Sequence, residues 1–387
     1  MVDRSYFDWN ATAPLRPQAA AALAEALAVA GNPSSVHAEG RAARRLVERA
    51  REQVAVLVGA EPGNVFFTSG GTEANMLALT PAIETAQEKR PRDRLLLSTI
   101  EHSSVRTGGR FPAGMVEDVP VKPDGRTDLD ALRGALAEAA RPLVSLMLAN
   151  NETGVVQPVA DAAAITHAAG GLIHVDAVQG PGRIACDIGV LGADVLTISA
   201  HKLGGPKGVG ALVRRADDIH FSEPLIRGGG QERGLRAGTE NVAGIVGFGA
   251  AAAAAGENWL AEAGRMRILR DALETGLKAI APQTVIFGEA AERLPNTTLF
   301  AVEGMKAETA VIAFDLEGIG VSSGAACSSG KVQPSHVLAA MGVSPELLRG
   351  AVRVSLGWTT TEADIERFLA AWRKLAKVLS KGHSIAA

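Results

Sequence analysis

Short apolar runs alternate with helix-length segments along the first two thirds of the chain. The runs are rich in Val, Leu, Ile and Phe and occupy 65–68, 95–99, 143–148, 172–175, 195–198 and 209–213. Over 41–58, apolar residues recur every three or four positions with charged residues between them, which is the period of a helix with one buried face. Strands that alternate with helices predict an α/β fold with a mostly parallel central sheet flanked by helices.

The pattern changes near Glu257. A long helical region runs through Lys278, and shorter helix and strand signals follow it. We therefore expect this part to form a second, smaller domain. It contains the segment 322–330, which is built of Ser, Gly, Ala and Cys327 and is too small and polar for a core element, so a loop is predicted there.

Polar residues come directly after several of the predicted strands. Thr72, His102, Asn151, Asp176 and Lys202 each follow one of the apolar runs within a few positions. In open sheets of parallel strands, ligands bind beyond the carboxyl ends of the strands. We therefore expect these side chains to surround one crevice.

Composition and charge exclude several classes of protein. The 387 residues carry 39 Lys and Arg against 42 Asp and Glu, a net charge of −3, so nucleic acid and anionic membranes are poor candidates for partners. No apolar run reaches the roughly 18 residues of a membrane span. Two cysteines, Cys186 and Cys327, are too few for a disulfide scaffold or a thiolate metal site. These features favour a cytoplasmic protein and suggest no metal.

Lys202 and Asp176 are the residues that suggest a particular chemistry. Lys202 precedes a loop rich in Gly and Pro that could hold its side chain in a cleft, where it would be either a charge partner for a phosphate or a Schiff-base lysine. Asp176 is costly to bury after an apolar strand unless it meets a cation, such as the protonated ring nitrogen of pyridoxal phosphate. Alternatively, Asp176 caps the next helix.

The remaining polar groups fit the same cofactor without proving it. Gly70, Gly71 and Thr72 open a helix, where backbone amides and a hydroxyl can bind phosphate, although an ordinary capped helix would look the same. Ser199 and His201 could add donors. His102 could stack on a planar ring, or be a histidine whose hydrogen bonds are satisfied at a strand end.

Together these residues resemble the cysteine desulfurases of the NifS and IscS type, in the class V aminotransferase-like branch of the fold-type I pyridoxal phosphate enzymes. The resemblance runs nearly end to end. The matching motifs are Asp8, 11–12, 31–35 with His37, 68–70 with Thr72 and Glu73, 101–102, 150–152, 174–176 with Gln179, 201–202 with 205–208, 227–234 with Arg236 and Thr239, 322–324 with Cys327, and Arg353 with 355–357.

The resemblance implies how pyridoxal phosphate would be held. Lys202 would form the Schiff base, His102 would stack on the ring, and Asp176 would pair with the ring nitrogen. Gln179 would bind the phenolic oxygen. The phosphate would be held by Gly71, Thr72, Ser199 and His201, and by Thr239 of the neighbouring subunit in a homodimer. The resemblance also implies a large cofactor-binding domain over 16–257 and a small domain formed by 1–15 with 258–387.

The same resemblance implies the reaction. Asn151, near the cofactor, and Arg353 would bind the carboxylate of L-cysteine, Arg353 through its bidentate fork. Lys202 would remove the α proton, and the Cys327 thiolate would take the sulfur as a persulfide and release alanine. Cys186 lies between apolar residues and is interpreted as structural.

Other functions compete with this interpretation. A selenocysteine lyase or an aminotransferase would use the same cofactor but needs no cysteine nucleophile, so Cys327 favours desulfuration. A non-catalytic assembly scaffold would be expected to lose Lys202 or Cys327. A nicotinamide-dependent enzyme would need a G-x-G-x-x-G turn after the first predicted strand, where the chain has none. The acceptor of the sulfur, such as an iron-sulfur scaffold, a transfer-RNA thiolation protein or a molybdenum cofactor enzyme, stays open.

Overall fold

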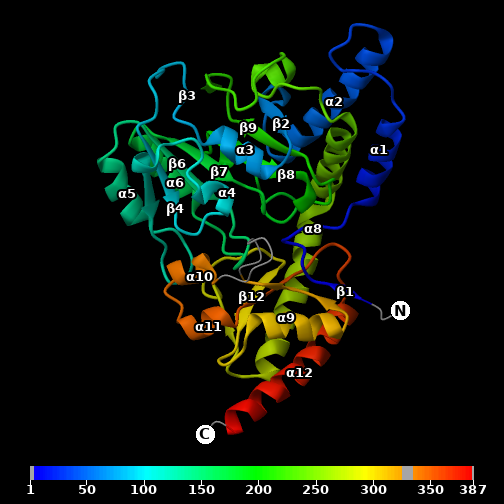
Figure 1. Cartoon of the computed structure of the whole chain (residues 1–387), viewed down its shortest axis with the longest axis vertical. Helices are drawn as coiled ribbons and strands as arrows, with labels where there is room; N and C mark the ends of the chain where they lie inside the picture. Colours follow the sequence, from blue (N-terminus) through cyan, green and yellow to red (C-terminus); the bar gives the residue numbers. More distant parts are fainter. Residues whose placement is uncertain (1–3, 325–333, 386–387) are drawn as a thin grey trace.

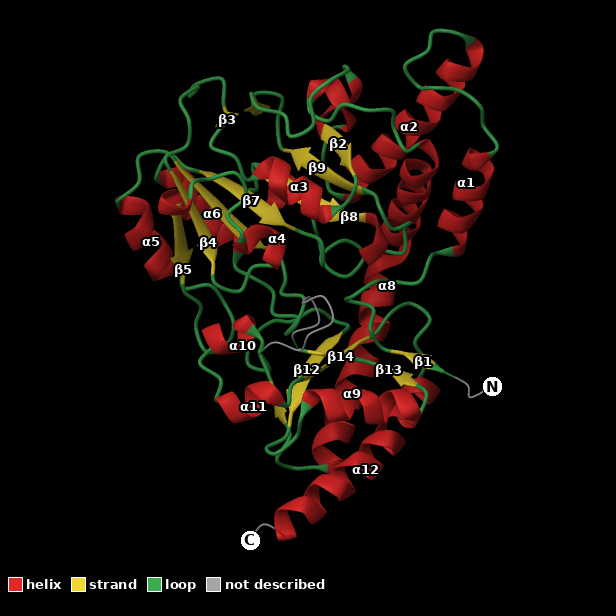
Figure 2. Ribbon diagram, in the orientation of Figure 1, coloured by secondary structure: helices red, strands yellow, loops and turns green. Residues whose placement is uncertain are grey.

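A seven-stranded sheet forms the centre of the larger part of the computed structural model, which describes residues 4–324 and 334–385 (Figures 1 and 2). The strand order is β2-β9-β8-β7-β6-β4-β5. The strands from β8 to β5 run parallel, whereas β9 is antiparallel to both of its neighbours. The strands are β2 (Val65–Thr68), β4 (Arg94–Ser98), β5 (Val116–Val119), β6 (Pro142–Met147), β7 (Leu172–Asp176), β8 (Val195–Ser199) and β9 (Gly210–Arg214).

The expected α/β fold is confirmed, and every apolar run assigned to this sheet is a strand within one or two residues of the expected bounds. The edge strand β5 was missed. Its sequence, Val-Glu-Asp-Val, places two charged residues between the valines, and only Val119 is buried. A short, charged edge strand carries little of the apolar signal by which buried strands are recognised.

Helices cover both faces of the sheet because successive strand side chains point to opposite sides. Phe67 belongs to a cluster with the helix residues Val54 and Phe248, whereas its neighbour Phe66 packs with Leu77 on the other face. The covering helices are α1 (Pro17–Leu27), α2 (Ala38–Leu57), α3 (Gly71–Ala78), α4 (Ser103–Arg106), α5 (Leu129–Ala137), α6 (Val159–Ala168), α7 (Ile188–Leu191) and α8 (Val242–Ile280).

A second, antiparallel sheet forms the centre of the smaller part, in the order β11-β12-β15-β14. Its core cluster includes Phe7, Phe300, Phe368 and Trp372. The predicted loop begins later than expected, because Ser322–Ser323 pairs with β15. The elements are β11 (Val285–Ile286), β12 (Thr297–Ala301), α9 (Ala307–Leu316), β14 (Ser322–Ser323), α10 (His336–Ala340), α11 (Pro345–Arg349), β15 (Val352–Ser355) and α12 (Glu362–Ile385).

Helix α8 passes from one part of the molecule to the other (Figure 1). It begins at Val242, well before the expected helical region, and leaves helical geometry at Asn258, where φ is −129°. The domain boundary at 257/258 stays a prediction. Two short sheets complete the fold, β1 (Ser5–Tyr6) with β13 (Ile319–Gly320), and β3 (Ile83–Glu84) with β10 (His220–Phe221).

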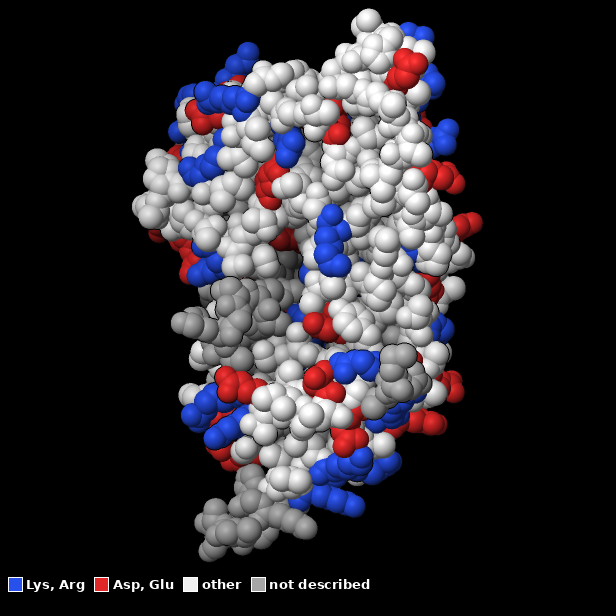
Figure 3. Space-filling model, turned by 45° about the vertical axis from the view of Figure 1, so that its right-hand side comes forward, with Lys and Arg blue, Asp and Glu red and all other residues white. Residues whose placement is uncertain are grey.

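The surface carries mixed charge. On the face drawn in Figure 3, basic and acidic side chains are interspersed rather than gathered by sign. Among the helices in the described ranges, none is long and apolar enough to cross a membrane.

Candidate active site

A cavity of about 310 Å³ lies at the carboxyl ends of the parallel strands, where the sequence placed its crevice. It has the size of a small-molecule site. The predicted site residues that line it are Gly71, Thr72, His102, Asn151, Asp176, Gln179, Ser199, His201, Lys202 and Arg353.

Lys202 follows β8 in a single 3-10 turn, Ala200–Lys202. Its Nζ donates hydrogen bonds to the backbone carbonyl oxygens of Asn10, at 2.6 Å, and Ala11, at 2.8 Å. The loop after it requires glycine, because Gly204 has a φ of +88° and a Cβ there would lie 2.4 Å from the ring of Trp358. The amine is thus held in the cavity by a chain segment far away in sequence.

Asp176 ends β7 and is 6% exposed. Its Oδ1 accepts a hydrogen bond from the Val178 amide at 3.0 Å, and its Oδ2 accepts one from Nδ2 of Asn75 at 2.9 Å. The carboxyl of Glu101 is fully buried nearby, and burial, followed by the charge of Asp176, raises its pKa well above the usual range. Burial and the nearby Asp176 thus both disfavour the charged form of Glu101.

His102 follows β4 and caps α4, where its Nδ1 accepts a hydrogen bond from the Ser104 amide at 3.2 Å. Ser104 Oγ lies 2.8 Å from the same nitrogen. The half-buried ring lines the cavity. Burial raises the pKa of Glu152, near His102, to about 7, against the lowering effects of Ser335, Arg353 and His102.

Hydrogen-bond donors gather at the start of α3. Gly71 and Thr72 open this helix, and the buried Ser199 and the half-buried His201 lie beside it in the cavity lining. Burial, and then the charge of Lys202, lowers the pKa of His201 to about 4. A Cβ on Gly71 would lie 3.0 Å from Val178 Cγ2 and 3.5 Å from Ser199 Cβ, so glycine fits this tightly packed wall best.

Arg353 reaches the cavity from β15 of the second sheet and is 1% exposed. Its Nη1 donates to the Asn151 carbonyl at 2.9 Å, and its Nη2 bonds the Asp8 carboxylate at 2.7 Å. Its Nε is buried and has no hydrogen-bond partner among the described residues. A buried guanidinium with an open donor is suited to binding a carboxylate.

Several residues that build this site were not found by the sequence analysis. Asp8 was quoted only as a motif, and Asn75 had no role. Arg183 was also missed: it is buried beneath Lys202, donates to Gln179 Oε1 and the Lys202 carbonyl, and burial lowers its pKa to about 9. Gln179 itself donates to the Asn10 carbonyl at 3.0 Å. Buried polar residues such as these carry no periodic signal that could reveal them.

Two predicted residues are not placed in the cavity. Thr239 is exposed and lines a separate hollow of about 260 Å³, with Thr68 and Glu232. Cys327 lies outside the described residues. Cys186, in contrast, is buried in the core of the large sheet, and burial raises its pKa to about 12, which agrees with a structural role.

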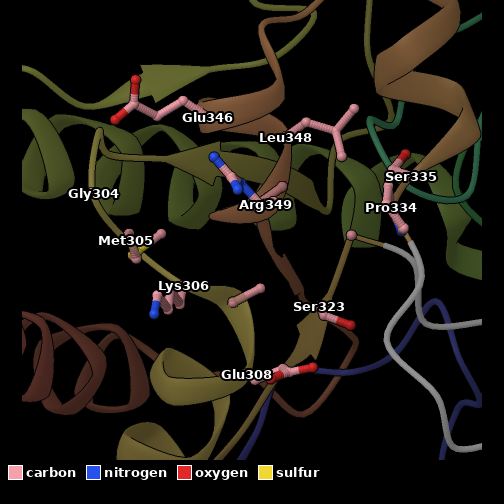
Figure 4. Close-up of a pocket in the computed structure, with 13 residues that line it drawn as sticks. Gly304, Met305, Lys306, Glu308, Ser323, Pro334, Ser335, Glu346, Leu348 and Arg349 are labelled. Carbon is pink, nitrogen blue, oxygen red and sulfur yellow. The ribbon is translucent and has the colours of Figure 1, made fainter.

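A larger cavity, of about 420 Å³, lies in the smaller part of the molecule (Figure 4). Lys306, Glu346 and Arg349 stand around it, and Gly324 and Pro334 also line it. Its described lining includes no histidine and no aspartate. The combination of an amine, a buried carboxylate and an imidazole is found in the cavity that holds Lys202, which we therefore take as the candidate active site.

Comparisons with known proteins show the family of the chain. The family model for class V aminotransferases matches residues 5–368. A cysteine desulfurase of Cereibacter sphaeroides is 45% identical over 95% of this chain and 94% of its own length, and an IscS-like cysteine desulfurase of Mycobacterium tuberculosis is 38% identical over 94% of each. A NifS-like protein of Rickettsia africae superposes with a TM-score of 0.87 at 35% identity, covering 97% of this chain and 100% of that one. The chain therefore belongs to the class V aminotransferase family and, within it, to the cysteine desulfurases.

Proposed function

We propose that the protein is a pyridoxal-phosphate-dependent cysteine desulfurase that converts L-cysteine to L-alanine and retains the sulfur as a persulfide on Cys327. The observation that carries the proposal is the convergence of Lys202, Asp176 and His102 on one cavity, opposite the buried guanidinium of Arg353. An amine, a buried carboxylate and a donor-rich helix start match the aldehyde, the ring nitrogen and the phosphate of the cofactor.

The residues present fit pyridoxal phosphate. Lys202 would bond to it covalently, Asp176 would pair with its ring nitrogen, and His102 would stack on its ring, beside Asn151. Gln179 would bind its phenolic oxygen with the amide hydrogen not used on Asn10. When bound, the cofactor withdraws electrons from the substrate Cα. The donors for its phosphate would be the Gly71 amide, Thr72, Ser199 and His201.

The side chains of the cavity would bind the substrate and move its protons. Arg353 would bind the carboxylate of L-cysteine through its open Nε and the Nη2 that now contacts Asp8. Asn151 would orient the same group. Lys202 Nζ would take the proton from the substrate Cα, and Asp176 would pair with the ring nitrogen, since burial disfavours a charge on the nearby Glu101.

The sulfur step requires a nucleophile. The Cys327 thiolate would form an S–S bond to the substrate sulfur while the C–S bond breaks, and the carbon would end as the methyl group of alanine after taking up a proton. The sum is L-cysteine plus enzyme thiol giving L-alanine plus enzyme persulfide. The persulfide would then pass to a sulfur acceptor, such as an iron-sulfur scaffold protein.

We also propose a homodimer located in the cytoplasm. Thr239 supports the dimer, because it is exposed and opens on a hollow apart from the cavity, where it could serve a neighbouring subunit's cofactor. Two cysteines, one of them buried and not paired in a disulfide, suit a reducing compartment.

The decisive test compares the two cysteines. Cys327→Ser should still bind the cofactor and L-cysteine, because these steps use Lys202, Asp176 and Arg353, but it should form no persulfide and no alanine from cysteine. Cys186→Ser is the matched control. It should keep wild-type turnover and lose about 1 to 3 kcal/mol of stability, since it buries a hydroxyl in an apolar site.

Alanine and protein-bound persulfide are measured from L-cysteine. If Cys327→Ser releases alanine at the wild-type rate, Cys327 is not the nucleophile, and elimination of the lyase type takes its place. If wild-type protein converts L-cysteine to 3-mercaptopyruvate and passes the amino group to a 2-oxo acid instead of forming persulfide, the protein is an aminotransferase and the proposal fails.

A further inference from the structure

A buried hydrogen-bond network extends from the wall of the cavity, which Asn75 and Ser104 themselves line, and Asn75 is its centre. Asn75 sits on α3 and is 1% exposed. Its Nδ2 donates to Asp176 Oδ2 and to Ser104 Oγ, both at 2.9 Å, and its Oδ1 accepts from Thr197 Oγ1 at 2.5 Å. One side chain thus connects β7, β8 and the start of α4.

The orientation of the Asn75 amide follows from its partners. An ionised carboxylate can only accept hydrogen bonds, so the atom that faces Asp176 Oδ2 must be the nitrogen. Both N–H groups of Nδ2 are then used, one on Asp176 and one on Ser104. Oδ1 faces Thr197 and takes the proton of its hydroxyl.

The hydrogen bonds keep the same donor-to-acceptor direction on the far side of Thr197. Because its hydroxyl proton goes to Asn75, Thr197 Oγ1 must accept from Nε2 of His174, which lies 3.2 Å away. Nδ1 of His174 then accepts from Ser145 Oγ, at 2.9 Å. A neutral His174 satisfies both bonds, and burial lowers its pKa to about 4, against the raising effect of Asp176.

On the near side of Asn75, the direction of the hydrogen bonds fixes the tautomer of His102. Ser104 Oγ accepts from Asn75, so its own proton is available for Nδ1 of His102, at 2.8 Å. The Ser104 backbone N–H, which can only donate, points to the same nitrogen at 3.2 Å. Nδ1 therefore carries a lone pair, and the neutral ring has its proton on Nε2. From Ser145 to His102, every donor in this chain points the same way.

We propose that Asn75 is a positioning residue for the desulfurase reaction, holding the Asp176 carboxylate in place and fixing His102 as its Nε2–H tautomer through Ser104. The expected effect on the reaction rate rests on the proposed function, whereas the expected tautomer of His102 does not. Asn75 acts through Asp176 and His102, which line the cavity. The direction of its hydrogen bonds is set by the chain of donors that begins at Ser145. Its effect is therefore on the geometry and protonation of other groups.

The first experiment measures the tautomer directly. NMR of the holoenzyme labelled with ¹⁵N-histidine distinguishes a protonated from an unprotonated ring nitrogen, and His102→Gln assigns the signal. Wild-type protein should show an unprotonated Nδ1 and a protonated Nε2 on His102. In Asn75→Ala, Ser104 Oγ is free to accept from a protonated Nδ1, and only the Ser104 backbone N–H, at 3.2 Å, still favours an unprotonated Nδ1, so a mixture of tautomers is expected. A protonated Nδ1 in the wild-type protein overturns the proposal.

The second experiment uses a variant that keeps the shape of the core. Thr197→Val removes the hydroxyl that orients Asn75 Oδ1, and Thr197 is not part of the cavity lining. We expect kcat for alanine formation to fall about tenfold while KM for cysteine changes less than about twofold, because the contacts of Arg353 are untouched. Thr166→Val is the matched control. Its hydroxyl is fully buried and bonds only Ala162 of its own helix, so wild-type kinetics are expected.

The outcomes separate this inference from the proposed function. Wild-type kcat and a single His102 tautomer in both Asn75→Ala and Thr197→Val overturn the positioning role. An equal loss in Thr166→Val would mean that the rate loss is a general effect of core packing, which also overturns it. If wild-type holoenzyme makes no alanine from cysteine, the proposed function fails, and the tautomer of His102 still decides the role of Asn75.

Discussion

The cavity has two ends, and they are built differently. At the end around Asp176, both carboxylate oxygens are bonded, and Asn75 uses both its N–H groups and its carbonyl. At the end around Arg353, the guanidinium contacts Asp8 and the Asn151 carbonyl, but its buried Nε has no partner in the described part of the chain. We call the first the saturated end, because each of these side-chain polar atoms has a hydrogen-bond partner. We call the second the open end, because Arg353 Nε has none among the described residues.

The origin of the residues explains the difference. Asp176, Asn75 and Thr197 come from one sheet and the helix packed on it, so their geometry is set by a single continuous core. Arg353 comes from the second sheet and Asp8 from the amino-terminal segment. A saturated end can hold a group that stays bound through many turnovers, and an open end can exchange one carboxylate for another.

The largest effect is expected from the saturated end. Asp176→Ala should lower turnover of L-cysteine by roughly 10²–10³-fold even with the cofactor bound, because the charge beneath the ring is lost. Turnover is measured as alanine formed, and visible absorption reports the bound cofactor. Asp161→Ala, on the exposed side of α6, is the control and should behave as wild type. Near-normal turnover with bound cofactor would show that Asp176 is not the ring partner.

The buried network at the same end predicts a pH dependence of stability. The pKa of His174 is about 4 in the folded protein, against about 6.5 when unfolded. As pH falls below about 6.5 the unfolded chain takes up a proton that the folded protein refuses, so the free energy of unfolding falls between about pH 6.5 and 4. By pH 5 this histidine should account for a loss of about 2 kcal/mol.

Urea unfolding at pH 7 and pH 5 measures this loss. In His174→Gln, the difference between the two pH values should be smaller than in the wild type by that amount. His220→Gln, at an exposed position on β10, should leave the difference unchanged. An identical pH difference in wild type and His174→Gln would mean that His174 does not stay neutral in the fold.

The smallest effect is expected from the open end. Asp8→Asn removes the carboxylate that contacts Arg353 Nη2, so substrate no longer competes with it, and KM for L-cysteine should fall by about threefold to tenfold. Without substrate, the buried guanidinium loses its ion pair, and the free energy of unfolding should fall by about 1 to 3 kcal/mol. Steady-state kinetics and urea unfolding measure the two effects.

A control separates the cavity from ion pairs in general. Asp315→Asn removes the partner of Arg4 in an exposed ion pair, where little energy is at stake, and should change neither quantity. If KM rises in Asp8→Asn, Asp8 orients Arg353 for the substrate instead of competing with it.

The sequence was sufficient for the parts of the fold and site that depend on local pattern. Apolar runs located the strands from β2 to β9 except β3 and β5, and polar residues at strand ends located the cavity lining, including Asp176 and Lys202. Both follow from rules that operate over a few consecutive residues.

The other parts of the site depend on contacts between residues that are far apart in the sequence. Asn75 looked like an ordinary polar residue inside a short helix, and its three side-chain hydrogen bonds become visible only once α3 is packed on β8. Asp8 and Arg353 are separated by most of the sequence, so their contact follows from tertiary structure alone. Thr239 was found by resemblance, and its place outside the cavity could be learned only from the fold.

The amino-terminal segment has a consequence for how the protein is synthesised. Its strand β1 pairs with Ile319–Gly320, Asp8 bridges to Ser355, and the next residues supply the carbonyl groups that hold Lys202. Residues 5–11 are therefore synthesised long before residues 319–355, with which they pair. Contacts of such long sequence separation form late in folding. A nascent chain can complete the seven-stranded sheet early, but the segment that holds Lys202 is fixed in place only after β15 has been synthesised.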